Sequence, residues 1–249
     1  MKVALIGYGK MGQEIEKVIL DKIKSEGQND EIVLRITDLN LADLTVENLK
    51  KADVAIEFTQ PDAAVANIYK CFEAGVPVVV GTTAWLNRLD EVRQKCTELN
   101  GTLFFSPNYS IGVNIFWEVN KRLAQLMNKQ PQYELSMEEI HHTEKKDAPS
   151  GTAVRTAEVI LQQVDRKKNW KLEEGGNKLP ASDSLLIVAK RLANVPGTHT
   201  VTYSSDVDFI EIKHEAISRR GFAEGAVLAA RYVLDKKGVY EMKDLLGIG

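Results

Sequence analysis

The chain has only two cysteines among its 249 residues, Cys71 and Cys96. They form no CxxC pair and stand near no histidine, so we expect free thiols in a reducing cytoplasm. Long apolar runs are also missing, because a run such as residues 76–80 is far too short to span a bilayer. The first residues show no apolar segment with a small-residue cleavage site, so no signal peptide is expected. These absences together predict a cytoplasmic location.

The chain also lacks an excess of positive charge. Lysine and arginine total 32 against 35 for aspartate and glutamate, which gives a net charge of −3. That balance gives no support to a nucleic-acid or anionic-membrane partner. With 44% hydrophobic and 27% charged residues, the composition is that of a folded globular protein. The length predicts one or two domains, large enough to fold without disulfides or a structural metal.

The first half of the chain alternates short apolar runs with amphipathic segments. Strands are expected over residues 2–6, 31–37, 52–58, 76–80 and 102–106, and helices over residues 11–24, 61–75 and 86–99. Strands that alternate with helices of this length predict βαβ units and a parallel sheet.

The pattern changes after Pro107. Helices are expected over residues 111–127, 150–164 and 222–234, a strand over residues 133–141, and a polar surface loop over residues 167–182. Three more strands, over residues 185–191, 198–204 and 209–216, follow without intervening helices and predict an antiparallel block. The last helix has an apolar face and is expected to return to the first domain.

A glycine-rich turn follows the first strand. Residues 7–12, Gly-Tyr-Gly-Lys-Met-Gly, fit G-x-G-x-x-G and open the first helix. The first glycine allows the tight turn, the second lets the backbone approach a pyrophosphate, and the third lets the helix pack on the strand. The N-terminus of the helix offers N–H groups and a positive dipole end to phosphates. The turn therefore predicts a dinucleotide site.

Asp38 stands just past the second strand, where a carboxylate accepts hydrogen bonds from the adenosine ribose. A carboxylate there also repels a 2′-phosphate, and the next residues, Leu39 and Asn40, are not basic. Lys10, in the glycine turn, is a cation that can contact a phosphate. Asp38 thus favours NADH and leaves NADPH open.

Residues 139–153 hold the most informative cluster. His141, His142 and Lys145 come at the end of a strand, and a loop then leads to Ser150, Gly151 and Thr152 at a helix N-terminus. The N–H groups of these last three residues suit a carboxylate, and Gly151 permits close backbone approach. Histidine and lysine supply the proton that such an anion needs on reduction.

The same residues also have simpler interpretations that do not involve a substrate. Adjacent histidines on a strand point to opposite faces and there is no HExxH spacing, so no metal site is expected. The lysines alone fit solvated charges, and Ser150 alone fits an N-cap. Combined with a dinucleotide domain, the cluster is interpreted as a substrate site.

The stretch His-His-x-x-Lys-x-Asp-Ala-Pro-Ser-Gly-Thr-Ala, which begins at His141, resembles the signature of the dihydrodipicolinate reductase family. The resemblance extends over nearly the whole chain. Its further matches are residues 7–12, 56–61, 81–83, 106–114, 214–219 and 222–226. Departures from the family's common residues are Lys10 for arginine, Glu57 for aspartate and Ala84 for glycine, and they concern the cofactor rather than the reaction.

The resemblance implies reduction of the cyclic dicarboxylate 4-hydroxy-tetrahydrodipicolinate (dihydrodipicolinate) to tetrahydrodipicolinate, in lysine and diaminopimelate biosynthesis, with a hydride from NADH or NADPH. It gives His141 the acid–base role and Lys145 the proton-donor role, and it places His142, Gly151 and Thr152 on the substrate, beside the Ser150 N–H predicted above. The implied cofactor contacts are Gly7, Tyr8, Gly9, Lys10, Met11, Gly12, Asp38, Gly81, Thr82, Thr83, Ser106, Pro107, Asn108 and Tyr109.

The expected fold class is therefore α/β. A Rossmann-type parallel-sheet domain for the dinucleotide comprises residues 1–108 and 219–249. A smaller α/β domain, residues 109–218, binds the substrate and forms a homotetramer through its sheet. Two alternatives remain: a related NAD(P)-dependent dehydrogenase of another amino-acid precursor, such as aspartate or homoserine, and a non-catalytic NADH-sensing module. The His-His-Lys cluster argues against the first, and the lack of a helix-turn-helix pattern argues against the second.

Overall fold

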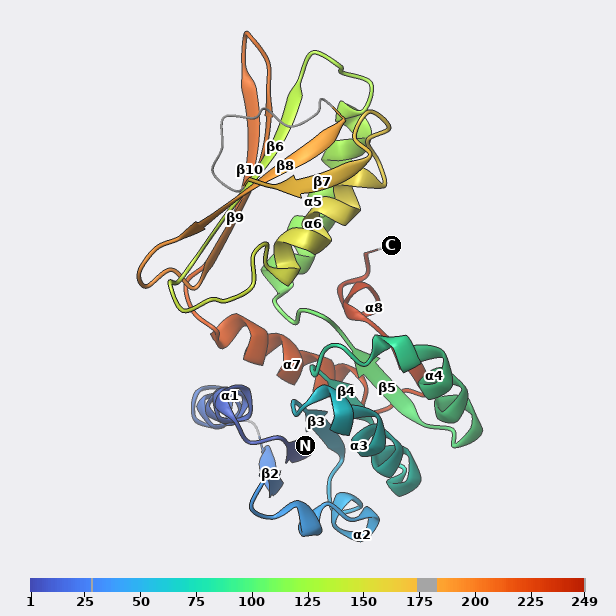
Figure 1. Ribbon diagram of the computed structural model, residues 1–249. Coiled ribbons are helices and arrows are strands. Elements are labelled where there is room, and N and C mark those ends of the chain that lie inside the picture. The colour runs from blue at the N-terminus through green and yellow to red at the C-terminus, as the bar shows by residue number, and fades with distance from the viewer. Residues whose placement is uncertain (28, 174–182, 249) are drawn as a thin grey trace. The chain divides into compact units, whose positions relative to one another are not determined.

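The computed structural model describes residues 1–27, 29–173 and 183–248, and the chain divides into two compact units (Figure 1). The first unit comprises Met1–Ile111 and Arg220–Gly249, and the second comprises Gly112–Arg219. The sequence analysis divides the chain after residues 108 and 218, slightly earlier in both places.

The first unit is built on a parallel sheet of six strands, in the order β11-β5-β4-β3-β1-β2. Its strands are β1 (Lys2–Ile6), β2 (Glu31–Ile36), β3 (Val54–Glu57), β4 (Val78–Val80), β5 (Thr102–Phe105) and β11 (Gly238–Tyr240). All of β3, β4 and β5 is buried, as expected of strands that are covered on both faces. The predicted parallel sheet is confirmed, and β11 is an edge strand that the sequence analysis did not predict.

Helices cover both faces of this sheet. The long helices are α1 (Lys10–Glu26), α3 (Pro61–Ala74), α4 (Leu89–Glu98) and α7 (Arg220–Tyr232). The short ones are η1 (Leu41–Asp43), α2 (Val46–Leu49), η2 (Leu86–Arg88) and α8 (Met242–Leu246). One apolar cluster joins α3 and α4 to the sheet, and a second joins α1 and α7 to it. The predicted return of the last helix to the first domain is confirmed.

The second unit has a mixed sheet of five strands, in the order β10-β9-β6-β8-β7. Its strands are β6 (Glu134–His141), β7 (Asn169–Leu172), β8 (Ser184–Arg191), β9 (Gly197–Ser204) and β10 (Phe209–Ala216). β9 runs antiparallel to both β6 and β10, whereas β8 runs parallel to both β6 and β7.

Two predictions for this unit are wrong. β8 does not join β9 in an antiparallel block, because it lies on the far side of β6. The predicted surface loop over residues 167–182 contains β7, an edge strand whose exposed Asn169 and Lys171 hide the apolar alternation of a strand. The rest of that predicted loop, residues 174–182, lies outside the described residues.

Helices α5 (Ile111–Met127) and α6 (Gly151–Leu161) belong to the apolar core on one face of the mixed sheet (Figure 1). On β6, Leu135 and Met137 point into this core. Because side chains alternate along a strand, Glu139 and His141 lie on the same covered face. This alternation buries a carboxylate and an imidazole next to an apolar core.

Both cysteines are free, as predicted, and the structure shows that both are buried. Among the described residues, no helix is long and apolar enough to cross a bilayer.

Candidate active site

The glycine turn of the first unit is shaped by two glycines that have no room for a side chain. Gly7 has φ +93°, and a Cβ on it would lie 2.0 Å from the Phe58 carbonyl oxygen. A Cβ on Gly12 would lie 2.3 Å from the Gly7 carbonyl oxygen. Gly9 has open space beside it, and as the N-cap residue of α1 it provides no side-chain cap. The first turn of α1 therefore faces a space where a phosphate fits.

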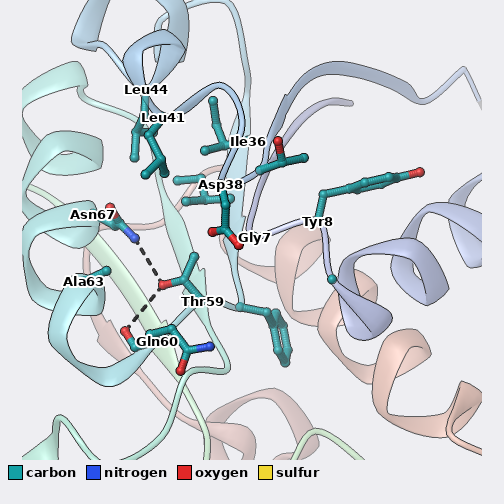
Figure 2. Close-up of a pocket in the computed structure, with 14 residues that line it drawn as sticks. Gly7, Tyr8, Ile36, Asp38, Leu41, Leu44, Thr59, Gln60, Ala63 and Asn67 are labelled. Atoms are coloured by element: carbon teal, nitrogen blue, oxygen red, sulfur yellow. Dashed lines mark hydrogen bonds between the residues drawn. The ribbon is translucent and has the colours of Figure 1, made fainter.

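A cavity of about 300 Å³ opens beside this turn (Figure 2). Leu41 and Leu44 lie on one side of it and Thr59 and Gln60 on the other, with the Asp38 side chain between them. Of the predicted cofactor residues, those that line the cavity are Gly7, Tyr8, Gly9 and Asp38. None of its fourteen described lining residues is lysine or arginine. The volume of the cavity, the glycine turn and the Asp38 carboxylate together fit the adenosine part of a dinucleotide.

Behind the cavity, a buried glutamate ties the end of β3 to its neighbours. Glu57 is fully buried and accepts hydrogen bonds from Asn67 Nδ2 (3.2 Å) and the Thr59 hydroxyl. The Thr59 N–H donates to Thr82 Oγ1 (2.7 Å), which brings a predicted cofactor residue against this loop. Burial raises the pKa of Glu57 above its ordinary value, while these hydrogen bonds oppose the rise.

The other predicted cofactor residues lie outside this cavity. Gly81 and Thr82 follow β4, and a Cβ on Gly81 would collide with the Phe58 ring at 2.0 Å. After β5, the Ser106 hydroxyl donates to the Asn108 carbonyl (2.7 Å), and the buried Tyr109 hydroxyl donates to the Val80 carbonyl (2.8 Å). Lys10, Thr83 and Pro107 are exposed, and Met11 is half-buried.

These residues nevertheless share one edge of the sheet. Asp38, the glycine turn, Thr59, Gly81 and Ser106 each come just after a strand, and these strands are neighbours in the order β2, β1, β3, β4, β5. In open parallel sheets, ligands bind beyond the carboxyl ends of the strands. The row is thus an extended surface of which the cavity is one end.

In the second unit, β6 ends at His141 and a loop carries Lys145 toward α6. The Lys145 ammonium binds both carboxylate oxygens of Asp147, at 2.8 and 2.9 Å. This contact holds the pKa of Asp147 below its ordinary value. The backbone N–H of Lys145 donates to the His142 carbonyl (3.1 Å), which closes the turn after the half-buried His142.

The N-terminus of α6 begins at Ser150, as predicted. Its Oγ accepts a hydrogen bond from the Ala153 N–H (3.2 Å), which makes it the N-cap. Its own N–H donates to Glu139 (3.0 Å), so this N–H is not directed at a ligand. Gly151 is exposed, and a Cβ there would meet nothing within 4 Å. Gly151 is therefore the open part of this helix end.

Glu139 lies under this site with an exposed fraction of 0%. Arg191 on β8 donates to its carboxylate at 3.2 Å, and His141 Nδ1 lies 3.5 Å from it. His199 Nε2, on β9, lies 3.8 Å from the same carboxylate and 3.1 Å from Ser150 Oγ. Burial lowers the pKa of both histidines, that of His199 to about 3.

Glu139, His141 and His199 bring one donor atom each within 4.8 Å of one another, the proximity that a metal site needs. The sequence analysis expects no metal. The guanidinium of Arg191 already neutralises Glu139 and repels a second cation at this place. We therefore interpret the cluster as a buried ion pair with two imidazoles.

Family models match both units. The model described as "Dihydrodipicolinate reductase, N-terminus" matches residues 1–109, and "Dihydrodipicolinate reductase, C-terminus" matches residues 112–246. The chain belongs to the dihydrodipicolinate reductase family. The N-terminal domain of this family binds NAD(P), so the cofactor class is that of a nicotinamide dinucleotide.

Individual relatives within the family match along their full length. The 4-hydroxy-tetrahydrodipicolinate reductase of Christiangramia forsetii is 45% identical over 248 residues, covering 99% of this chain and 98% of the relative. That of Methanosarcina barkeri is 36% identical over 270 residues, covering 100% of both. In fold, the chain is similar to a dipicolinate-bound dihydrodipicolinate reductase from Paenisporosarcina sp. TG-14, with a TM-score of 0.77, 21% identity and 97% of both chains covered.

Sequence reasoning missed residues at both places. It did not select Thr59, Gln60 and Asn67 as cofactor contacts, although Thr59 and Gln60 come just after a buried strand and Asn67 lies on the helix that follows. It also missed Glu139 and Arg191. The available signal was the alternation of β6, in which an acidic residue occupies a position on the apolar face.

Proposed function

We propose that the chain reduces 4-hydroxy-tetrahydrodipicolinate to tetrahydrodipicolinate with NAD(P)H. The observation that carries this proposal is the grouping of Lys145, His141, His142 and the open end of α6 in the second unit. A dicarboxylate that gains a hydride needs bound carboxylates and a proton donor, and this grouping has both. Membership of the family, and the names of relatives at 45% and 36% identity, support it.

In this proposal, His141 and Lys145 are the catalytic residues, with Lys145 as the proton donor. His142, Gly151 and Thr152 hold the carboxylates, whereas Ser150, which the sequence analysis also placed there, donates its N–H to Glu139 and caps α6. The nicotinamide, when bound, supplies the hydride. The predicted cofactor contacts of the first unit bind and orient it: the glycine turn takes the pyrophosphate, and Asp38 takes the adenosine ribose. The Asp147 carboxylate binds the Lys145 ammonium within the loop that leads to α6.

A coupled assay tests the reaction. Aspartate semialdehyde, pyruvate and the upstream synthase generate the unstable substrate, and absorbance at 340 nm reports oxidation of NADH or NADPH. We expect oxidation that depends on the synthase. Lys145→Ala should lower kcat by about 100-fold, while Lys146→Ala, which changes the exposed neighbouring lysine, should leave it unchanged. NADH binding without any turnover would favour the sensing module instead and overturn the proposal.

For cofactor preference we propose NADH. Asp38 faces a cavity that offers no described lysine or arginine to a 2′-phosphate. Asp38→Ala should raise KM for NADH and lower KM for NADPH, whereas Glu47→Ala, which removes an exposed carboxylate from α2, should change neither. Equal changes of both KM values in Asp38→Ala would contradict the assignment.

We also propose that the protein is a homotetramer assembled through the mixed sheet. The face opposite to α5 and α6 carries half-buried Ile140, Leu186 and Val188 among the hydroxyls of Ser136, Thr200 and Thr202. The same face also carries the Glu138–Lys190 ion pair, and such a mixture of apolar, hydroxyl and paired charged side chains suits contact with a second copy. Light scattering should give four times the chain mass, and Val188→Lys should lower it; a monomeric wild type would contradict the proposal. A cytoplasmic location stays a prediction.

A further inference from the structure

Glu139 is the point where three parts of the second unit meet. It lies on β6, its carboxylate accepts the Ser150 N–H at the start of α6 (3.0 Å), and it accepts Arg191 from β8 (3.2 Å). A fully buried carboxylate is costly unless it is paired and hydrogen-bonded, and both conditions are met here. The surroundings of Glu139 therefore stabilise its carboxylate in the charged form.

Arg191 extends this arrangement into the loop that carries Lys145. Its guanidinium donates to the Asp147 carbonyl (2.7 Å) and to the Lys145 carbonyl (3.4 Å). The loop is also joined to β8 by the Leu192 N–H, which donates to the His141 carbonyl (2.8 Å). The Glu139–Arg191 pair thus connects to the backbone of the residues proposed as catalytic.

His141 turns one nitrogen toward Glu139. Nδ1 is buried, makes no hydrogen bond to the described residues, and lies 3.5 Å from the Glu139 carboxylate. Catalytic hydrogen bonds are often long without a ligand and shorten when one binds. The hydrogen bond at one ring nitrogen sets the proton and the orientation of the other. With Nδ1 facing inward, Nε2 is the nitrogen left for a ligand.

We propose that Glu139 is a positioning residue, which orients the His141 imidazole with Nε2 toward the substrate and anchors Ser150 at the start of α6. This inference rests on the proposed reduction for its kinetic consequence. The orientation and the protonation of the His141 imidazole, in contrast, can be measured in the absence of turnover.

Several charged and titratable groups surround His141. From the loop come Lys145 and Asp147, from β8 comes Arg191, from β9 comes His199, and Glu139 lies on the same strand. The negative groups stabilise the charged imidazole, and the positive groups oppose it. Removing the Glu139 charge should therefore lower the pKa of His141, and removing the Arg191 charge should raise it.

The chain has four histidines, so their ring nitrogens can be followed individually by nuclear magnetic resonance. We expect Glu139→Gln to move the His141 titration to lower pH, and Arg191→Met to move it to higher pH. Glu138→Gln is the matched control, because Glu138 is the adjacent residue on the opposite face and pairs with Lys190. It should leave the His141 titration unchanged. If Arg191→Met does not fold, the double variant Glu139→Gln/Arg191→Met removes both charges, and its titration should fall between the wild type and Glu139→Gln.

The kinetic arm uses the full enzyme. Glu139→Gln should lower kcat by about 10- to 100-fold with a small change in KM for the nicotinamide, and the His141 limb of the kcat–pH profile should move to lower pH. An unchanged His141 titration and pH profile would overturn the positioning role, even if the variant were less stable. Absence of turnover in the wild type would overturn the proposed function instead, and the histidine titration would still decide the role of Glu139.

Discussion

Two glutamates, one in each unit, are fully buried near the end of a strand, yet their surroundings differ in charge. Glu57, at the end of β3, accepts hydrogen bonds from neutral groups, Asn67 and Thr59. Glu139, on β6, is paired with the guanidinium of Arg191 and flanked by two imidazoles. Burial raises the pKa of Glu57, because no described cation compensates the loss of water.

The comparison shows that burial alone does not give a carboxylate its role. Neutral donors make Glu57 a junction between β3, α3 and the loop after β4, behind the cofactor cavity. A cation makes Glu139 part of a charge network that reaches the substrate loop. The variants below are ordered by the size of the effect we expect.

Arg191→Met should reveal the difference between the surroundings of Glu139 and Glu57 most strongly. It leaves the Glu139 charge buried without its cation, and breaking a buried ion pair costs about 3 kcal/mol. Lys190→Met is the control, since Lys190 is an exposed neighbour paired with Glu138 and should cost less than about 0.5 kcal/mol. Urea unfolding measures both. Equal stability losses would show that the Glu139 pair is no stronger than a surface pair.

His199→Gln should reduce the loss of folding stability at acidic pH, a loss to which the Glu57 site does not contribute. The pKa of His199 is about 3 in the folded chain, below its ordinary value, so the unfolded chain takes up the proton first as pH falls. Stability is therefore lost below about pH 6.5, at up to about 1.4 kcal/mol per pH unit. His141 and His214 contribute with the same sign and remain in the variant. Urea unfolding at pH 7 and pH 5 should show a smaller loss in His199→Gln; an equal loss would contradict this prediction.

Gly197→Ala should disturb the contact between His141 and Glu139 without changing any charge. A Cβ on Gly197 would lie 3.0 Å from His141 Nε2, so the imidazole must shift. We expect kcat to fall about tenfold, because a displaced catalytic group loses its alignment. Gly221→Ala is the control, since a Cβ there approaches other atoms no closer than 4.0 Å. Wild-type kcat in Gly197→Ala would show that the position of the ring is not critical.

Glu57→Gln should have the smallest effect. The pKa of Glu57 is raised in the folded chain, so the unfolded chain releases the proton first as pH rises above about 4.3. Wild-type stability therefore declines from there toward the raised pKa, and the variant should lack this decline. At pH 7 we expect Glu57→Gln to be equally stable or more stable by at most about 1 kcal/mol. A clear destabilisation, measured by urea unfolding, would mean that Glu57 needs its charge.

The sequence was sufficient for features that depend on local pattern. The glycine turn, the five strands of the parallel sheet before residue 108 and the N-cap at Ser150 follow from apolar periodicity and from residue types. Those predictions were confirmed because the residues that determine them are neighbours in the chain.

What sequence reasoning missed depends on contacts between distant segments. The place of β8 beside β6 is set by pairing of residues 186–191 with residues 136–141, which no local pattern reveals. The same pairing puts Arg191 next to His141 in register and so creates the Glu139 cluster. β7 escaped notice because half of its side chains are exposed and polar.

The discontinuous chain path of the first unit has a consequence for synthesis. Gly238 on β11 pairs with Thr102 on β5, and α7 covers the face of the sheet that also carries α1. Residues 112–219, which make up the second unit, leave the ribosome between these partners. At about 5–20 residues per second, the sheet waits about 7–27 seconds for its last strand and helix. During that interval Val3, Leu5 and Val79 lack a covering surface that they have in the finished protein, so part of the apolar face of the sheet stays exposed while the second unit is being made.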